Sequence, residues 1–203
     1  GNDIEVAYCD LDRTGDLDVP YSFGTGGYYY NSVNGYNSNQ AYSIWIDTVV
    51  GTDAHHMRVH HNIIRNDWSG GVYIEYSKPG RHHIYENIVI NGGLRYNGYA
   101  GCIGSGRGTT GALFYKNTLY CPSALSWSAM FLQAGDKADE ATSGNEFRDN
   151  LCLVNSSVAA IHDSSRAAPG TNVFRNNLIY VIGGGTPLFR YHGGSNVVFP
   201  ERF

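Results

Sequence analysis

The sequence of 203 residues carries little charge, and the charge is not concentrated anywhere. Lys and Arg together number 14 against 18 Asp and Glu, and charged residues make up 16% of the chain. No run of Lys or Arg occurs, so electrostatic binding to a nucleic acid backbone is not expected. No apolar run approaches the roughly 20 residues that a membrane-spanning helix requires. We therefore expect neither a nucleic acid nor a membrane as a partner.

Helix and metal signals are also missing. No stretch repeats apolar residues at spacings of three and four, so amphipathic helices are not expected. The four cysteines show no C-x-x-C spacing, and we predict no metal and no cofactor. One disulfide among them remains open, and the sequence does not pair them. The cysteines are Cys9, Cys102, Cys121 and Cys152.

The chain is instead rich in residues of short strands and tight turns. It contains 26 Gly, 18 Asn and 16 Tyr, and 42% of its residues are hydrophobic. Tyr favours strands, Gly and Asn favour turns, and the hydrophobic fraction is high enough for a folded core. This composition indicates an all-β protein.

A short pattern centred on Asn occurs five times. Successive copies are 25, 30, 33 and 27 residues apart, with an apolar residue three positions before each Asn. Each copy is followed by a turn and a second apolar strand. Units of this length without helices are typical of a parallel β-solenoid, in which stacked coils share one apolar interior. The five residues are Asn62, Asn87, Asn117, Asn150 and Asn177.

We predict a single domain over residues 1–203, a right-handed parallel β-helix of about six coils with an inserted Tyr-, Asn- and Gly-rich loop at 21–42. The repeated Asn residues are expected to adopt left-handed dihedrals and to bond from coil to coil. An antiparallel sandwich is the alternative, but it does not require the same Asn at the same offset. The chain begins at Gly1, which we interpret as a processed or partial product. A further domain, a partner chain or the loop is expected to cover the solenoid ends.

Two of the second strands place a carboxylate at the same position. In 43–47 (SIWID) and 71–75 (GVYIE), strand alternation directs the Ile and Val side chains inward. Trp45 and Tyr73 then face outward side by side, as do Asp47 and Glu75. Neighbouring parallel strands lie about 4.7–4.9 Å apart, close to the roughly 5–5.5 Å between the carboxyl groups of a retaining glycosidase. Two carboxylates at that distance repel, so one is expected to keep its proton.

These strands resemble the core of right-handed β-helix glycoside hydrolases, including the β-xylosidases of that fold. The resemblance covers residues 43–93 and depends on an Asp that ends a W-x-D strand and a Glu that ends a G-x-x-x-E strand one coil later. It implies Asp47 as nucleophile and Glu75 as general acid/base, acting on a poly- or oligosaccharide. Ser43 stands where Gly is usual, and relatives of this type are longer, with extra domains. We expect a secreted protein with a carbohydrate substrate.

Further residues are candidates for substrate binding. Trp45 and Tyr73 would offer aromatic faces to a sugar, and Gln133 and Asp163 end later strands in or near the carboxylate column. The loop at 21–42 is either a sugar-binding lid or a cap on the solenoid end.

Other polar groups are interpreted without a site. The paired residues His60 and His61 should point to opposite faces of a strand, so they are not expected to share a metal. The acidic segment 10–18 lacks the final Glu of an EF-hand loop and is interpreted as a solvated turn.

Two other functions remain open. A polysaccharide lyase would use a Lys, Arg or Tyr base, with or without calcium, and candidates are Lys78, Arg81, Arg107 and Tyr76. A non-catalytic carbohydrate-binding or adhesin β-helix would use the same aromatic column without needing both carboxylates.

Overall fold

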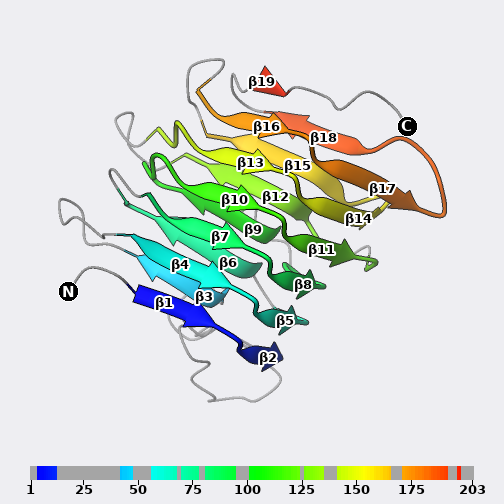
Figure 1. The fold of residues 1–203 in the computed structure, drawn as a ribbon. Coiled ribbons are helices and arrows are strands. Elements are labelled where there is room, and N and C mark those ends of the chain that lie inside the picture. Colours follow the sequence, from blue (N-terminus) through cyan, green and yellow to red (C-terminus); the bar gives the residue numbers. More distant parts are fainter. Residues whose placement is uncertain are drawn as a thin grey trace, which may run out of the picture.

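The computed structural model describes residues 4–12, 42–47, 56–67, 70–77, 81–94, 101–123, 126–134, 141–165, 171–191 and 196–197. These residues form β-strands and no helix, and every pair of neighbouring strands runs parallel. The chain visits three sheets in turn and returns to the first one coil further on (Figure 1). Within the described ranges, no helix is long and apolar enough to span a membrane.

Each sheet is named here after its first strand. The β1 sheet contains, in order, β1 (Ile4–Ala7), β4 (Met57–His60), β7 (His83–Tyr85), β10 (Leu113–Tyr115), β13 (Glu146–Arg148), β16 (Val173–Arg175) and β19 (Asn196–Val197). The β2 sheet contains β2 (Asp10–Asp12), β5 (Ile63–Arg65), β8 (Ile88–Ile90), β11 (Thr118–Cys121), β14 (Leu151–Asn155) and β17 (Leu178–Ile182). The β3 sheet contains β3 (Tyr42–Asp47), β6 (Gly70–Glu75), β9 (Gly101–Gly106), β12 (Ser128–Gln133), β15 (Ala159–Ser164) and β18 (Leu188–Tyr191).

This arrangement confirms the predicted all-β parallel solenoid. The β1 sheet has seven strands and the other two sheets have six each, so the described stack holds the expected six coils and one additional strand. Successive coils stack in register, so each row of equivalent positions runs along the molecule. The rows that face inward form the core.

The apolar residue three positions before each repeated Asn belongs to such an inward row. The members of this row are fully buried or nearly so, and their aromatic rings stack from coil to coil. The ring centroids of Phe114 and Phe147 are 4.3 Å apart, and those of Phe147 and Phe174 are 4.8 Å apart. The row consists of Val59, Ile84, Phe114, Phe147 and Phe174.

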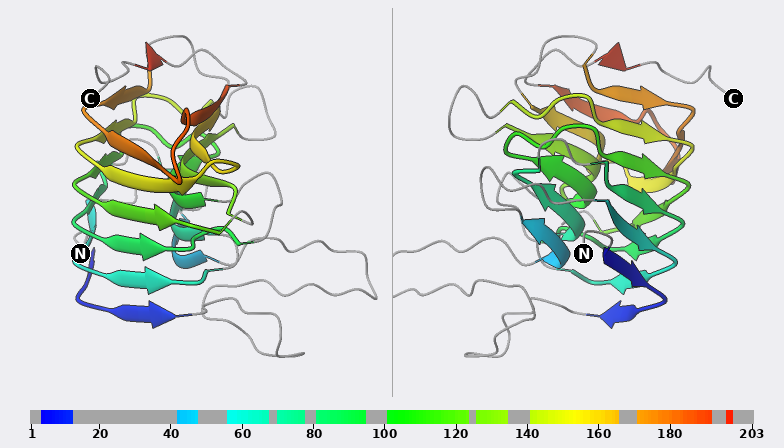
Figure 2. Two further views of the ribbon diagram at one scale, coloured as in Figure 1. Left: turned by 90° about the vertical axis from the view of Figure 1, so that its right-hand side faces the viewer. Right: turned by 60° about the vertical axis from the view of Figure 1, so that its left-hand side comes forward.

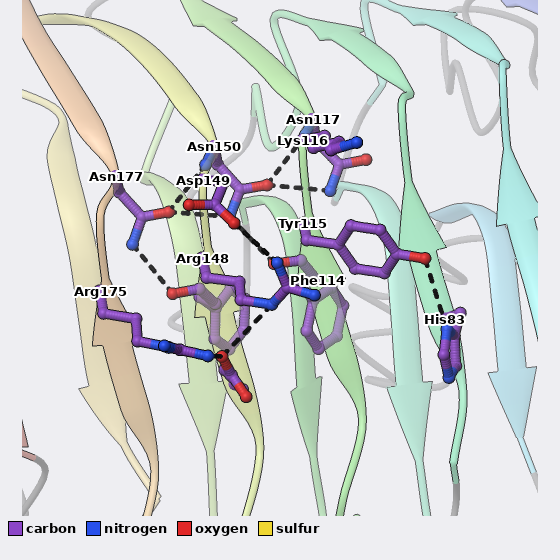
Figure 3. Close-up of polar contacts among 12 residues, drawn as sticks. His83, Phe114, Tyr115, Lys116, Asn117, Arg148, Asp149, Asn150, Arg175 and Asn177 are labelled. Atoms are coloured by element: carbon purple, nitrogen blue, oxygen red, sulfur yellow. Dashed lines mark hydrogen bonds and ion pairs between the residues drawn. The ribbon is translucent and has the colours of Figure 1, made fainter.

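The repeated Asn residues form the predicted ladder between coils. Oδ1 of Asn150 accepts hydrogen bonds from both the backbone N–H and the side-chain amide of Asn117, each at 3.0 Å. Asn150 Nδ2 in turn donates to Asn177 Oδ1 at 2.9 Å and to the carbonyl of Phe114 at 3.0 Å (Figure 3). Every Asn of the ladder is buried, so these bonds satisfy polar groups that water does not reach.

The expectation of left-handed dihedrals on these Asn residues is wrong by one position. The residue just before each ladder Asn has the positive φ, because the chain turns outward there before the Asn points inward. The residues concerned are His61, Glu86, Lys116, Asp149 and Asn176, with φ between 53° and 55°.

The outer face of the β2 sheet is apolar at most positions. Leu178 and Tyr180 are more than half exposed, and Ile88, Tyr120 and Leu151 each expose more than a third of their surface. The left view of Figure 2 looks onto this sheet, whose strands lie one above another.

Candidate functional site

The outer face of the β3 sheet carries the predicted catalytic pair and its aromatic neighbours. Strands β3 and β6 pair in the predicted register, with Trp45 opposite Tyr73 and Asp47 opposite Glu75. The side chain of Asp47 lies outside the described part of the chain. The two carboxylate-bearing residues are therefore backbone neighbours on adjacent strands, as expected.

Two outer rows continue from these pairs across the next strands. The aromatic row contains Trp45, Tyr73, Gly104, Phe131 and His162. The carboxylate row contains Asp47, Glu75, Gly106, Gln133 and Ser164.

Glycine interrupts both rows at strand β9. A Cβ on Gly104 would fall inside the van der Waals radius of the Phe131 ring and its carbonyl, and a Cβ on Gly106 would meet the Tyr73 hydroxyl. Side chains of the neighbouring strands occupy the space that the two glycines leave above β9. Tyr73 extends over β9 from β6 and donates to Gln133 Oε1 on β12 at 2.9 Å.

The aromatic residues around Gly104 pack on one another. The rings of Tyr42 and Tyr73 stack with centroids 4.5 Å apart, and those of Tyr73 and Phe131 are 5.4 Å apart. These three side chains are at most 1% exposed, and Trp45 packs against them while remaining partly exposed. In this structure, Trp45 is the member of the cluster that reaches solvent, whereas the ring faces of Tyr73 are covered.

Glu75 is buried beside a guanidinium. It is 1% exposed, and its Oε2 lies 3.3 Å from Nε of Arg107, which follows β9. Arg107 also donates to the hydroxyl of Tyr76 at 3.2 Å. Burial lowers the pKa of Arg107, but the charge of Glu75 and the bond to Tyr76 outweigh it and raise that pKa. The guanidinium therefore stays charged and lies within ion-pair distance of the Glu75 carboxyl group.

The same charge affects the neighbouring phenols. Burial raises the pKa of Tyr73 well above its ordinary value, and the charges of Tyr42 and Glu75 add to this. Tyr73 is therefore a neutral hydrogen-bond donor near neutral pH. Its hydroxyl links the Glu75 end of the carboxylate row to Gln133.

Of the two further candidates, one belongs to the carboxylate row and one does not. Gln133 is in the row, but Asp163 pairs with Leu132 and lies in the adjacent inward row. Asp163 is fully buried, its Oδ1 accepts the Ser165 N–H at 2.9 Å, and burial raises its pKa. The one-residue offset turns its side chain away from the outer face, so the expected alignment is wrong for Asp163.

His162 takes the outer position that precedes Asp163. Its Nδ1 accepts the indole N–H of Trp127 at 2.7 Å, and it is 5% exposed. His162 is therefore a packed, hydrogen-bonded histidine.

The remaining candidates are placed as far as the described ranges allow. Arg107 and Tyr76 lie beside Glu75, whereas Lys78 and residues 21–41 and 13–18 lie outside the described part. Asp10 forms an ion pair with Arg65 and lies on β2. All four cysteines are free, and Sγ of Cys102 lies 2.8 Å from Sγ of Cys121.

The sequence indicated Arg107 only as a candidate lyase base and gave no sign of its contact with Glu75 or of the role of the glycines. The strand 101–105 (GCIGS) reads as apolar, and nothing in its pattern says that Phe131 and Tyr73 would fill the space above Gly104 and Gly106. The signal that could have indicated this packing is a strand with Gly at both outward positions, 104 and 106, between strands with large outward side chains. Comparison of the chain with models of protein families, with curated proteins and with solved structures found no match.

Proposed function

We propose that this chain is a carbohydrate-active β-helix protein, a retaining glycoside hydrolase in which Asp47 and Glu75 form the catalytic pair. The observation that carries the proposal is their register: the two residues are direct partners on the adjacent strands β3 and β6. Parallel strands hold such partners about 4.7–4.9 Å apart, which suits the short carboxyl separation of a retaining mechanism. The resemblance of residues 43–93 to β-helix xylosidases supports the same pair.

A retaining mechanism divides two roles between the pair. One carboxyl group must be ionised as the nucleophile, and the other must carry a proton as the general acid. We assign Asp47 as the nucleophile and Glu75 as the general acid/base, the roles that the resemblance implies. The guanidinium of Arg107 lies 3.3 Å from Oε2 of Glu75 and orients that side chain.

The other polar groups of the rows suit a sugar. Gln133 lies on β12, two strands from Glu75, and Tyr73 lies on the same strand as Glu75. Their amide and hydroxyl groups offer donors and acceptors for ring hydroxyls, while Trp45 offers a partly exposed aromatic surface. Since Glu75 is 1% exposed in this structure, the mechanism requires that substrate binding uncovers its carboxylate.

The test is hydrolysis of a panel of aryl glycosides and xylo-oligosaccharides, followed by release of phenol and reducing sugar. Glu75→Gln and Asp47→Asn should each lower kcat by at least about 100-fold, because each removes one of two essential groups. Glu146→Gln changes a partly exposed carboxylate of the β1 sheet that is ion-paired with Arg175; it is the matched control and should keep full activity. Full activity in Glu75→Gln would overturn the proposal.

The assignment of roles has its own test. Azide added to Asp47→Ala should replace the missing nucleophile and yield a glycosyl azide of inverted anomeric configuration. A glycosyl azide of retained configuration would instead identify Asp47 as the acid/base and Glu75 as the nucleophile.

The two alternatives give different products. A lyase releases an unsaturated, ultraviolet-absorbing sugar from a uronate-containing polysaccharide, and a calcium-dependent one stops when EDTA is added. A binding module retains the oligosaccharide and releases nothing. Either result would replace the hydrolase proposal.

A further inference from the structure

Two cysteines from neighbouring coils meet inside the core. Sγ of Cys102, on β9, lies 2.8 Å from Sγ of Cys121, the last residue of β11. Both carry free thiols in this structure, and both are fully buried members of the hydrophobic core. Since β9 belongs to the β3 sheet and β11 to the β2 sheet, the contact joins two sheets as well as two coils.

The distance between the two sulfurs is short for a pair of thiols. Sulfurs joined in a disulfide are about 2.05 Å apart, so these two are about 0.8 Å from bonding distance. Core packing alone does not require sulfurs so close, because a buried thiol packs as a small apolar group at ordinary van der Waals distance. The contact therefore has the proximity that a covalent bond requires.

The backbone on each side of the contact is held in place. The chain passes against Cys102 at Gly92, where a Cβ would come within 2.8 Å of the Cys102 Cα and 3.2 Å of its Sγ. Cys121 is held from another direction, because it pairs with Val154 in the β2 sheet. Neighbouring segments thus fix the backbone positions of both cysteines, and the two side chains extend toward each other.

The other two cysteines make different contacts. Cys152 lies on β14, in the buried row of the β2 sheet that also contains Leu119 and Ile179. Sγ of Cys9, between β1 and β2, donates to the carbonyl of Ala7 at 3.5 Å. The geometry therefore selects one pair among the four cysteines, which the sequence left unpaired.

We propose that Cys102 and Cys121 become joined by a disulfide bond when the protein folds in an oxidising environment, whereas Cys9 and Cys152 remain thiols. The bond links residues 19 positions apart in the sequence and ties the coil of β9 to the coil of β11. Such a cross-link stabilises the folded chain, because it restricts the unfolded one. It persists in oxidising compartments, where disulfides are not reduced.

The oxidant is a small disulfide such as oxidised glutathione. The thiolate of one cysteine attacks a glutathione sulfur, which gives a mixed disulfide and one free glutathione. The thiolate of the second cysteine then attacks the cysteine sulfur of the mixed disulfide and releases the second glutathione. The two cysteines lose two protons and two electrons in total, and the two glutathione thiols gain them.

The exchange takes place before the core closes. Both cysteines are fully buried in the folded protein, so glutathione does not reach them there. The contact with Cys102, and then burial, also raise the pKa of Cys121, and the thiolate rather than the thiol is the attacking form. The bond therefore forms during folding and, once formed, is protected from reductants.

The test is refolding of the whole chain in reduced and oxidised glutathione, followed by denaturation, alkylation with N-ethylmaleimide and mass spectrometry. Of the four cysteines, we expect two to be alkylated, and the protein before alkylation should be lighter than its reduced form by two hydrogen atoms. Trypsin cleaves after Arg107 and Lys116, between the two cysteines of the pair. Two peptides that separate only on reduction would therefore identify the bond.

Two variants distinguish this bond from any other. Cys121→Ala should leave three thiols, all of them alkylated, whereas Cys152→Ala should leave one alkylated thiol and the same linked peptides. Urea unfolding provides a second measurement. Reduction should lower the urea midpoint of the wild type and of Cys152→Ala, and leave that of Cys121→Ala unchanged.

Four alkylated cysteines in the refolded wild type would overturn the proposal, and so would linked peptides that contain Cys9 or Cys152. Mass spectrometry detects the bond without any substrate, so the result is independent of the glycosidase assignment.

Discussion

Asn87 donates its side-chain amide to Oδ1 of Asn117 at 3.0 Å, and the same Nδ2 reaches the carbonyl of Val59 at 2.9 Å. Asn117 repeats this arrangement toward Asn150 and Ile84. Each Asn thus binds the coil before it and the coil after it. A parallel sheet bonds coils only through its strands, and this ladder bonds them through a turn as well.

Asn117→Ala should destabilise the protein by about 3 kcal/mol, because it removes the acceptor of the buried Asn87 N–H and the side-chain bond to the carbonyl of Ile84. Urea unfolding followed by circular dichroism measures the change. Lys116→Ala, on the exposed neighbour, is the control and should change the free energy of unfolding by less than about 1 kcal/mol. A loss in Asn117→Ala as small as that of the control would show that the ladder adds little.

Gly104→Ala should be poorly tolerated, because its Cβ would overlap both the ring and the carbonyl of Phe131. The carbonyl belongs to strand β12 and cannot move aside without breaking the sheet, so we expect a loss of about 3 kcal/mol or more. Gly183→Ala is an informative comparison. It meets nothing within 4 Å and has a φ of 82°, so it should cost only the backbone strain of about 1–2 kcal/mol. Equal melting temperatures for the two variants would contradict the steric argument.

The stability of the protein should fall as the pH drops from about 6.5 toward 4, owing to His82. Burial, then the charges of His56 and His83, lower its pKa to about 4, below the ordinary 6.5. Above 6.5 both the folded and unfolded states hold it neutral. Between 6.5 and 4 the unfolded chain binds a proton that the folded chain excludes, which costs up to about 3 kcal/mol.

The chain itself suggests the control for this prediction. Nδ1 of His82 accepts the Met57 N–H at 3.2 Å, as Oδ1 of Asn145 accepts the Ala112 N–H at 3.0 Å. His82→Asn should therefore keep that bond and lose most of the pH dependence in urea unfolding at pH 7 and pH 5. An unchanged pH dependence would show that other groups cause it.

The sequence predicted the parts of the molecule that repeat. The Asn spacing and the apolar residue before each Asn required stacked coils, and strand alternation then placed Asp47 beside Glu75. Each of these inferences depends on positions within one strand or at a constant offset from it. These offsets stay the same when the loops between coils differ in length.

The errors occurred where a strand ends or where a residue is absent. The left-handed residue precedes the ladder Asn, and His61 leaves the strand phase at that same turn. Asp163 lies one residue before the outer row, where Ser164 pairs with Gln133. The turn before β15 sets this register, and the lengths of such turns vary between coils. Arg107 comes from a turn, where strand alternation gives no direction to a side chain.

Five successive coils, from Asn62 to Asn177, present the same Asn to the next coil, so this part of the interface between coils repeats along the molecule. A coil deleted or duplicated between equivalent positions would leave matching surfaces on either side. The length of the molecule is therefore a property that can change in steps of about 4.8 Å, independently of the residues on its outer faces.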